Sequence, residues 1–230
     1  MNCDRLAPYY QALESITFGR KLEHCRFAFL EHAKSSQCAL LCGDGDGRFL
    51  SNLLSENPHV EVDFVDSSRK MLELADRRAS SLGRTFRNRA HFHLTDIRDF
   101  APRPSGYDLV ATHFFLDCFD DSELPHLVRR IASWTTAGAQ WLLSDFREAE
   151  GTLARICTRA VIRSLYAAFR LTTGLPVTRM PNYRAALTNA GFAPRLEENF
   201  LAGLLHASLW TPRSSTCFVS SPCSSSSPPS

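Results

Sequence analysis

The sequence lacks any apolar run that approaches the ~20 consecutive residues needed to span a membrane. It has eight cysteines but no CxxC pair, so the usual spacing of a structural zinc site or a disulfide framework is missing. The first residues, Met1–Arg5, include an acid and open no apolar stretch, which is unlike a secretory signal. We therefore expect reduced thiols in a cytoplasmic protein that holds no metal.

An excess of charge of one sign is also missing. The 230 residues carry 26 Lys and Arg against 24 Asp and Glu, a formal net charge of +2. This balance argues against duplex DNA as a partner, because DNA-binding domains are usually strongly basic. The hydrophobic content of 44% is that of an ordinary globular chain and suffices for a sizeable core. No DNA and no membrane are expected among the partners.

What the sequence does contain is an alternation of short apolar runs with amphipathic stretches. Strands are expected at 38–42, 60–66, 91–95, 108–116 and 140–146. Between them, Ser67 can cap a helix that carries Met71, and Asp121 or Ser122 can cap another that begins near Leu124. Strands that alternate with helices predict an α/β fold, with a doubly wound and mostly parallel sheet.

Other segments fall outside this alternation. Residues 1–35 are interpreted as an N-terminal helical cap, and 147–180 as a helical insertion whose helix, 152–171, has an apolar seam. That seam favours either core packing or a homodimer contact. A helix near 182–190 and strands at 192–200 and 204–210 would close the main domain, residues 36–212. Residues 213–230 are rich in serine and proline, and this composition predicts a disordered tail.

The chemistry is expected at a glycine-rich turn after the first strand. Gly43, Gly45 and Gly47 would let the backbone approach a ligand closely at a helix N-terminus. A dinucleotide fingerprint requires its third glycine at position 48, where Arg48 stands. The loop acids, Asp44 and Asp46, would repel phosphates and suit a ligand with positive charge.

Asp66 ends the second predicted strand, nineteen residues after Gly47. A carboxylate at this position can accept hydrogen bonds from both hydroxyls of a ribose. A cap for the following helix is the alternative role, although Ser67 could serve there.

These motifs, in this order, resemble the class I S-adenosylmethionine-dependent methyltransferases over roughly residues 36–146. The resemblance implies a seven-stranded sheet with a C-terminal antiparallel hairpin, and S-adenosylmethionine as the cofactor. It implies that the glycines contact the methionine part of the cofactor and that Asp66 binds its ribose. Ser67 and Met71 would flank the adenine.

The same resemblance assigns residues farther along the chain. Asp96 would contact the adenine amino group after the third strand, with Ile97 beside the ring. The end of the fourth strand, at His113, would border the cofactor and its transferred methyl. Residues 147–180 would cap the acceptor.

The sequence departs from the family pattern at two places. Leu41 stands two residues before the first glycine, where the family has an acid that helps to hold the cofactor's amino group. Asp44 and Asp46 are the candidates to replace that acid. The Asn-Pro-Pro-Tyr and Asp-Pro-Pro-Tyr motifs of the DNA and RNA amino-methylating branch are absent after the fourth strand.

His113 and Asp117 flank the end of the fourth strand, where the acceptor is expected. His113 is a candidate general base, and Asp117 could orient it or bind the substrate. The alternative is that His113 packs beside the cofactor and Asp117 caps a turn. Asp145 ends the fifth strand and faces either the acceptor or a loop. A divalent metal held by Asp117 and Asp145 is the less favoured interpretation.

The function predicted is methyl transfer from S-adenosylmethionine to O, N or S of a small or mid-sized, partly hydrophobic molecule. The chain's role would be to align donor and acceptor and to exclude water. Two alternatives stay open: a non-catalytic protein that binds the cofactor as a partner subunit, which Leu41 favours, and an RNA methyltransferase.

Overall fold

The computed structural model describes residues 20–147 and 181–213 of the chain. The α-helices in these ranges are α2 (Arg20–Phe27), α3 (Arg48–Glu56), α4 (Arg69–Ser81), α5 (Arg84–Asn88), α6 (Leu124–Ala132) and α8 (Tyr183–Asn189). Short 3-10 turns are η3 (Leu30–Ala33), η4 (Leu116–Cys118) and η5 (Leu201–Gly203). The strands are β1 (Cys38–Cys42), β2 (Glu61–Asp66), β3 (Ala90–Leu94), β4 (Tyr107–His113), β5 (Thr135–Phe146), β6 (Phe192–Phe200) and β7 (Leu205–Pro212).

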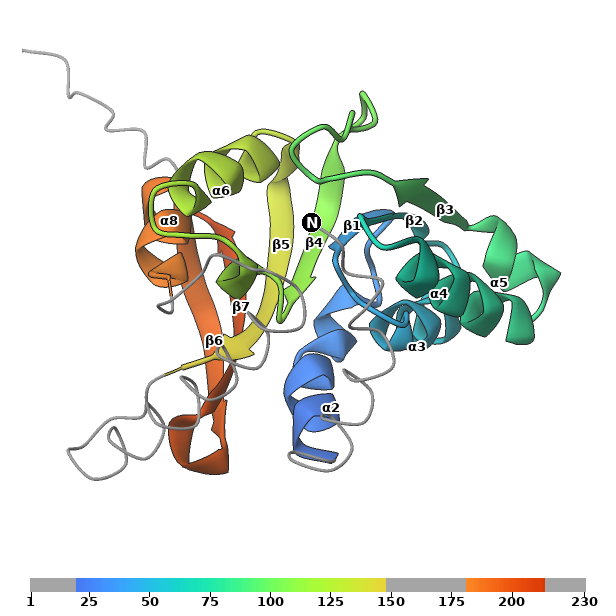
Figure 1. Ribbon diagram of the computed structural model, residues 1–230, viewed down its shortest axis with the longest axis horizontal. Helices are drawn as coiled ribbons and strands as arrows, with labels where there is room; N and C mark the ends of the chain where they lie inside the picture. Colours follow the sequence, from blue (N-terminus) through green and yellow to red (C-terminus); the bar gives the residue numbers. More distant parts are fainter. Residues whose placement is uncertain (1–19, 148–180, 214–230) are drawn as a thin grey trace, which may run out of the picture.

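The strands form one seven-stranded sheet with the order β3-β2-β1-β4-β5-β7-β6 (Figure 1). The first five strands pair in parallel, and β7 pairs antiparallel with both β5 and β6. This arrangement confirms the predicted fold class, including the closing antiparallel hairpin. The order reverses direction between β1 and β4, so the helices that follow the strands cross to opposite faces of the sheet.

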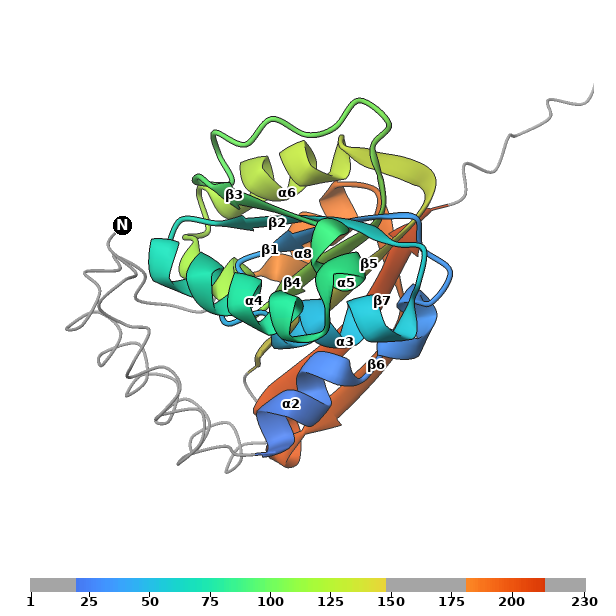
Figure 2. The ribbon, with the colours of Figure 1, turned by 90° about the vertical axis from the view of Figure 1, so that its right-hand side faces the viewer.

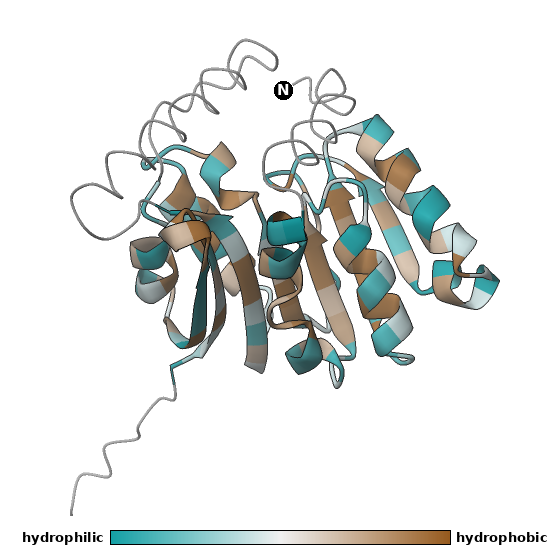
Figure 3. Cartoon of the chain, turned by 90° about the horizontal axis from the view of Figure 1, so that it is seen from below, coloured by the Kyte–Doolittle hydropathy of each residue, from teal (hydrophilic) through white to brown (hydrophobic). Residues whose placement is uncertain are grey.

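Helices cover both faces of this sheet, which Figure 2 shows with α6 above it and α3, α4 and α5 below. On one face, α3 and α4 bury an apolar stripe against alternate residues of β1, β2 and β4. On the other, α6 and α8 pack on the intervening residues of the same central strands and of β5. Strands that are buried on both faces need nearly continuous apolar sequence, and the central strands in Figure 3 are accordingly hydrophobic.

Helix α2 adds a third contact. Leu22 and Cys25 are buried against residues of β7 and against Phe114. The helix predicted in the N-terminal segment is therefore present from Arg20 to Phe27, and residues 1–19 lie outside the described residues. The predicted helix at 152–171, with its dimer or core seam, and the tail from 214 also lie outside them. No helix in the described ranges is long and apolar enough to cross a membrane.

Two predicted helix caps were wrong by one or more residues. Ser68, and not Ser67, caps α4, since its hydroxyl accepts the N–H of Met71 at 3.3 Å. Before α6, the carboxylate of Asp120 accepts the N–H groups of Ser122 and Glu123, each at 2.9 Å. In both cases the chain offered adjacent residues of the capping type, and tertiary packing selected one of them.

The fourth strand ends earlier than predicted, at His113 instead of residue 116. Phe114 has a φ of +54°, a left-handed conformation that a bulky residue rarely adopts, and it breaks the strand. The fifth strand begins earlier than predicted, at Thr135, with an irregularity in its pairing with β4 between Tyr107 and Leu109.

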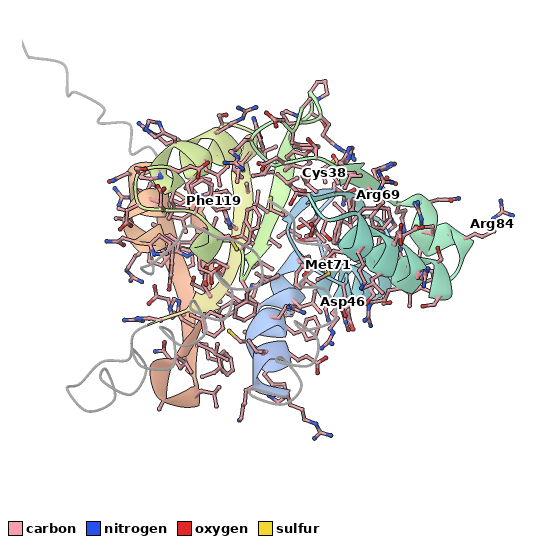
Figure 4. All side chains as sticks on the ribbon, viewed as in Figure 1. Cys38, Asp46, Arg69, Met71, Arg84 and Phe119 are labelled. Atoms are coloured by element: carbon pink, nitrogen blue, oxygen red, sulfur yellow. The ribbon has the colours of Figure 1, made fainter. Side chains whose placement is uncertain are left out.

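Helix α5 was not predicted, and the arginines around it were interpreted as surface charge. Arg84 extends into solvent, as Figure 4 shows. Arg89 does not, because its guanidinium donates to the carbonyl oxygens of Leu54 and Asn57 at 2.8 and 2.7 Å. It therefore closes the C-terminal end of α3, a structural role that a count of charges cannot reveal.

A buried carboxylate joins three strands at the middle of the sheet. Asp63 Oδ2 accepts from Arg103 Nε at 2.6 Å and from the Tyr107 hydroxyl at 2.7 Å, and Oδ1 lies 2.8 Å from His93 Nε2. Burial acts to raise the pKa of Asp63, but the hydrogen bonds from Arg103, His93 and Tyr107 together outweigh it and lower the pKa below its ordinary value. The folded state therefore favours the ionised carboxylate.

We expect Asp63→Ala to lower the free energy of unfolding at pH 7 by about 3 kcal/mol, because a buried hydroxyl and a half-buried guanidinium lose their shared acceptor. Since the native pKa is depressed, the stabilisation is present above the unfolded pKa of ~3.9 and is lost as the pH falls through the native value. Urea unfolding at several pH values measures both effects.

The matched control is Glu61→Ala on the same strand, whose carboxylate pairs with His91 at a largely exposed site. This change should cost less than ~1 kcal/mol. Equal costs for the two variants, or a cost of Asp63→Ala that does not shrink in acid, would contradict the assignment.

Candidate functional site

The predicted site residues gather at one edge of the sheet. Because β1, β2, β4 and β5 are parallel, their carboxyl ends meet at this edge. The order switches direction between β1 and β4, and open α/β sheets bind ligands outside the carboxyl ends at such a switch point. The loops that leave this edge carry the glycine turn, Asp66, His113 and Asp145.

The glycine loop has three residues in the left-handed region, with φ values of +60°, +65° and +76° at Gly43, Gly45 and Gly47. A Cβ on Gly43 would lie 2.3 Å from the ring of Phe115, and one on Gly47 would lie 2.6 Å from Ala75 Cβ. A Cβ on Gly45 would meet no atom within 4 Å. Two of these glycines are therefore required by packing, while the open space at Gly45 lets a ligand approach the backbone.

Asp44 is buried at the N-terminal end of α3. Its Oδ2 accepts the N–H of Leu50, in the first turn of that helix, at 3.1 Å. An acidic side chain at this end of a helix is stabilised by the unpaired N–H groups and the helix dipole. The carboxylate thus fixes the loop to the helix that follows it.

Asp46, labelled in Figure 4, is bound by two arginines. Its Oδ2 lies 2.8 Å from Arg78 Nη2 of α4 and 3.1 Å from Arg48 Nε. Arg48 also pairs with Glu23 of α2 at 3.1 Å. This network joins the glycine loop to α2 and α4. Of the two acids that could replace the family's acid, Asp46 is committed to arginines, which leaves Asp44 as the candidate.

Leu41 explains the departure from the family pattern in packing terms. Its side chain has an exposed fraction of 0% and lies in the apolar layer beneath α3, in the same cluster as Phe49 and Leu53. A carboxylate in this environment would need partners to offset its desolvation. At position 41 this chain therefore has an apolar core residue where the family has a cofactor contact.

The residues after β2 lie as the sequence order suggests. Asp66 is half-buried at the strand end, and its Oδ1 accepts the N–H of Ser68 at 2.7 Å. Ser67 is exposed, and Met71 is buried in the first turn of α4. The turn thus fixes the orientation of the Asp66 carboxylate, which leads the loop between β2 and α4.

Asp96 follows β3 and has a partner that sequence reasoning missed. Arg98 Nε lies 2.8 Å from Oδ1 and Nη2 lies 2.5 Å from Oδ2, and the same guanidinium reaches Glu123 at 2.8 Å. The hydrogen bonds from Arg98 lower the pKa of Asp96. Ile97 is buried beside it. An adenine contact at Asp96 would therefore share this carboxylate with Arg98.

His113 is buried on the α2/α3 face. Ser144 Oγ donates to the carbonyl oxygen of Cys25 at 2.8 Å and lies 3.0 Å from His113 Nδ1. Because the hydroxyl proton is used, His113 must donate through Nδ1–H, which leaves Nε2 unprotonated. Nε2 has no hydrogen-bond partner within the described ranges. Burial, and then the charge of Arg26, hold the pKa of His113 well below 6.5, so the ring is neutral at neutral pH.

Asp117 and Asp145 lie near each other after β4 and β5. Asp145 is fully buried, and burial followed by the negative charge of Asp117 raises its pKa well above the ordinary value. Asp117 lies in η4, where its carboxylate accepts the S–H of Cys118 at 3.6 Å. Among the described residues, no group of three or more His, Cys, Asp and Glu is arranged to hold a metal ion.

Comparison with known proteins places this geometry in a class. Residues 40–140 match the family model described as a methyltransferase domain. The chain is 28% identical over 136 residues to N-terminal Xaa-Pro-Lys N-methyltransferase 1 of Rattus norvegicus, and 27% identical over 136 residues to the Homo sapiens protein of the same name. Each alignment covers 59% of this chain and 59% of the relative, so the chain spans less than two thirds of these relatives' length.

Solved structures share the fold. The structure of a mitomycin 7-O-methyltransferase superposes with a TM-score of 0.63 at 16% identity, covering 92% of this chain and 61% of that one. An O-methyltransferase family 2 protein from Planctomyces limnophilus, solved in complex with apigenin, gives 0.64 at 20% identity and covers 90% and 62%.

The sheet order, the glycine loop and these likenesses define a Rossmann-like methyltransferase fold. The chain belongs to the class I S-adenosylmethionine-dependent methyltransferases, a family whose methyl donor is S-adenosylmethionine. The predicted family is thereby confirmed.

We expect Gly47→Ala to lower the free energy of unfolding by about 3 kcal/mol, because a left-handed alanine is strained and its Cβ overlaps α4 at Ala75. Gly45→Ala should cost only the strain, roughly 1–2 kcal/mol, because its Cβ enters open space. Urea unfolding of the two variants provides the comparison. If Gly45→Ala is at least as destabilising as Gly47→Ala, the packing role of the third glycine is refuted.

Proposed function

We propose that this domain catalyses methyl transfer from S-adenosylmethionine to O, N or S of a small or mid-sized acceptor. The observation that carries the proposal is the glycine loop, with its open space at Gly45, on the same edge of the sheet as the carboxylate of Asp66. The cofactor would supply an electrophilic methyl group on a sulfonium. The chain's own residues would bind and align the two reactants.

The residues at this edge fit the cofactor chemically. The ribose hydroxyls are donors, and the second oxygen of Asp66 suits them because Oδ1 already accepts the N–H of Ser68. The sulfonium and the amino group are positive, and the acidic loop residue Asp44 favours positive charge. Ser67 and Met71 would border the adenine, with Asp96 and Ile97 contributing from the end of β3.

The acceptor side of the proposal involves His113 and Asp117. His113 has a neutral ring whose Nε2 lone pair lacks a partner within the described ranges, so we propose that it accepts a hydrogen bond beside the cofactor. A nitrogen with a pKa well below neutrality is a weak base, which favours positioning over proton abstraction. Asp117 would contact the acceptor from η4.

The relatives' names cover different acceptors, namely peptide N-termini for the curated relatives and O-methylated compounds for the solved structures. We propose a small or mid-sized acceptor and a cytoplasmic location. Cys25, Cys38, Cys42 and Cys118 are free thiols, which supports a reducing compartment.

Isothermal titration of the full chain with S-adenosylmethionine and with S-adenosylhomocysteine tests the proposal. We expect micromolar binding of both, and a loss of affinity of roughly 10- to 100-fold in Asp66→Asn, since a charge-assisted hydrogen bond contributes about 1.5–3 kcal/mol. Asparagine keeps an oxygen for the N–H of Ser68, so the turn should survive.

Glu73→Gln is the matched control, because Glu73 is an exposed acid on α4. Its affinity should equal that of the unaltered chain. Failure of the folded protein to bind either ligand would refute the proposal, and the buried Leu41 would then support a protein that has lost the cofactor. Binding of both ligands without turnover on any acceptor would favour the non-catalytic partner.

A further inference from the structure

A second group of polar side chains is buried at the same edge of the sheet, on the α6/α8 face and apart from His113. Asp145 ends β5, and His206 of β7 lies directly opposite it in register. The exposed fractions of these two residues are 0% and 1%. The hydroxyl of Tyr183, from α8, lies 3.2 Å from His206 Nδ1. Asp117, 7% exposed, approaches from η4.

Two atoms of this cluster lack hydrogen-bond partners in the described part of the chain. Oδ1 of Asp145 accepts the N–H of Phe146 at 2.8 Å, but Oδ2 has no partner there. Nε2 of His206 also has none, since Glu197 Oε2 is 4.0 Å away. Buried polar atoms are nearly always paired. Because cross-strand neighbours share a face of the sheet, these two atoms can be satisfied by one ligand.

Charge indicates what that ligand is. Two carboxyl groups buried close together cannot both ionise without a compensating cation, and the raised pKa of Asp145 reflects this conflict. The neighbouring cations do not resolve it. Arg184 pairs with Glu197, and the charge of Arg147 acts on Tyr183 and on His206, whose pKa falls to about 4 through burial and this charge. A compact cation with several N–H donors would pair with the acids directly.

We propose that Asp117 and Asp145, with His206 and Tyr183, form an acceptor subsite that binds an ammonium group, so that the methylated atom is the nitrogen of an amine. This inference rests on the proposed function, because it gives the acceptor of that reaction. Oδ2 of Asp145 accepts one N–H, and His206 Nε2, in the tautomer that carries its proton on Nδ1, accepts another.

The same group accounts for the proton in the reaction. The bound ammonium gives one proton to the carboxylate of Asp145, which frees the nitrogen lone pair. That pair forms the new N–C bond while the methyl–sulfur bond breaks and the sulfur keeps its electron pair. The products are an N-methylammonium, S-adenosylhomocysteine and a protonated Asp145, so the charges balance.

The test measures binding without turnover, with the full chain saturated with S-adenosylhomocysteine. The probes are 2-phenylethylamine against 2-phenylethanol, and a hexapeptide that begins Ser-Pro-Lys against its N-acetylated form. We expect at least one amine to bind at least tenfold more tightly than its uncharged counterpart. Asp145→Asn should reduce the amine affinity at least tenfold and leave the affinity for S-adenosylhomocysteine within twofold.

Asp117→Asn is the second variant, in case Asp145→Asn fails to fold, and it should weaken amine binding in the same direction. Glu198→Gln, at an exposed acid on β6, is the control and should change neither affinity. Equal binding of amine and counterpart, no binding of either amine, or unchanged amine affinity in folded acid variants would overturn the proposal. Loss of S-adenosylhomocysteine binding by the unaltered chain would instead refute the proposed function.

Discussion

The parallel pairing of β1 with both β2 and β4 is the constraint on which the rest of the structure depends. It forces every connection out of these strands to leave at the same edge and sends the helices to opposite faces. The central strands must therefore be apolar on both sides, and polar chemistry can gather only where they end. The glycine turn, Asp66 and Asp145 are close to one another because of this geometry, although the sequence separates them widely.

The two faces of the sheet give the site two different environments. On the α2/α3 face, His113 is held in one tautomer by Ser144, beside the ring of Phe49 at 4.5 Å between centroids. On the α6/α8 face, Asp145 and His206 are buried with little to pair with. Successive residues of one strand point to opposite faces, so Ser144 and Asp145 serve separate clusters although they are adjacent in the chain.

Local patterns were enough to predict the strands, the glycine loop and the order of the motifs, because burial on both faces leaves continuous apolar runs. Contacts between distant segments were not predictable in this way. Arg78 binds Asp46 from 32 residues away, and Arg98 occupies a carboxylate that the family resemblance reserved for adenine. Each arginine looks like surface charge in the sequence, and only the packing of α4 and of the loop after β3 brings it to its acid. The strand end at His113 was also missed, since nothing in the sequence signals that Phe114 adopts a left-handed conformation.

The exchange of an acid for Leu41 is best understood as a relocation of negative charge. Position 41 lies inside the apolar layer beneath α3, and leucine there adds to the packing of that helix. Three residues later, Asp44 is bound to an N–H of the first turn of α3, where a helix favours negative charge. The loop thus keeps a buried acid near the switch point while the strand gains core contacts. Asp46 could not take this role, because its bonds to Arg48 and Arg78 already fix the loop against α4. A chain built this way can hold a positively charged ligand at the glycine turn with a carboxylate that comes from the loop itself.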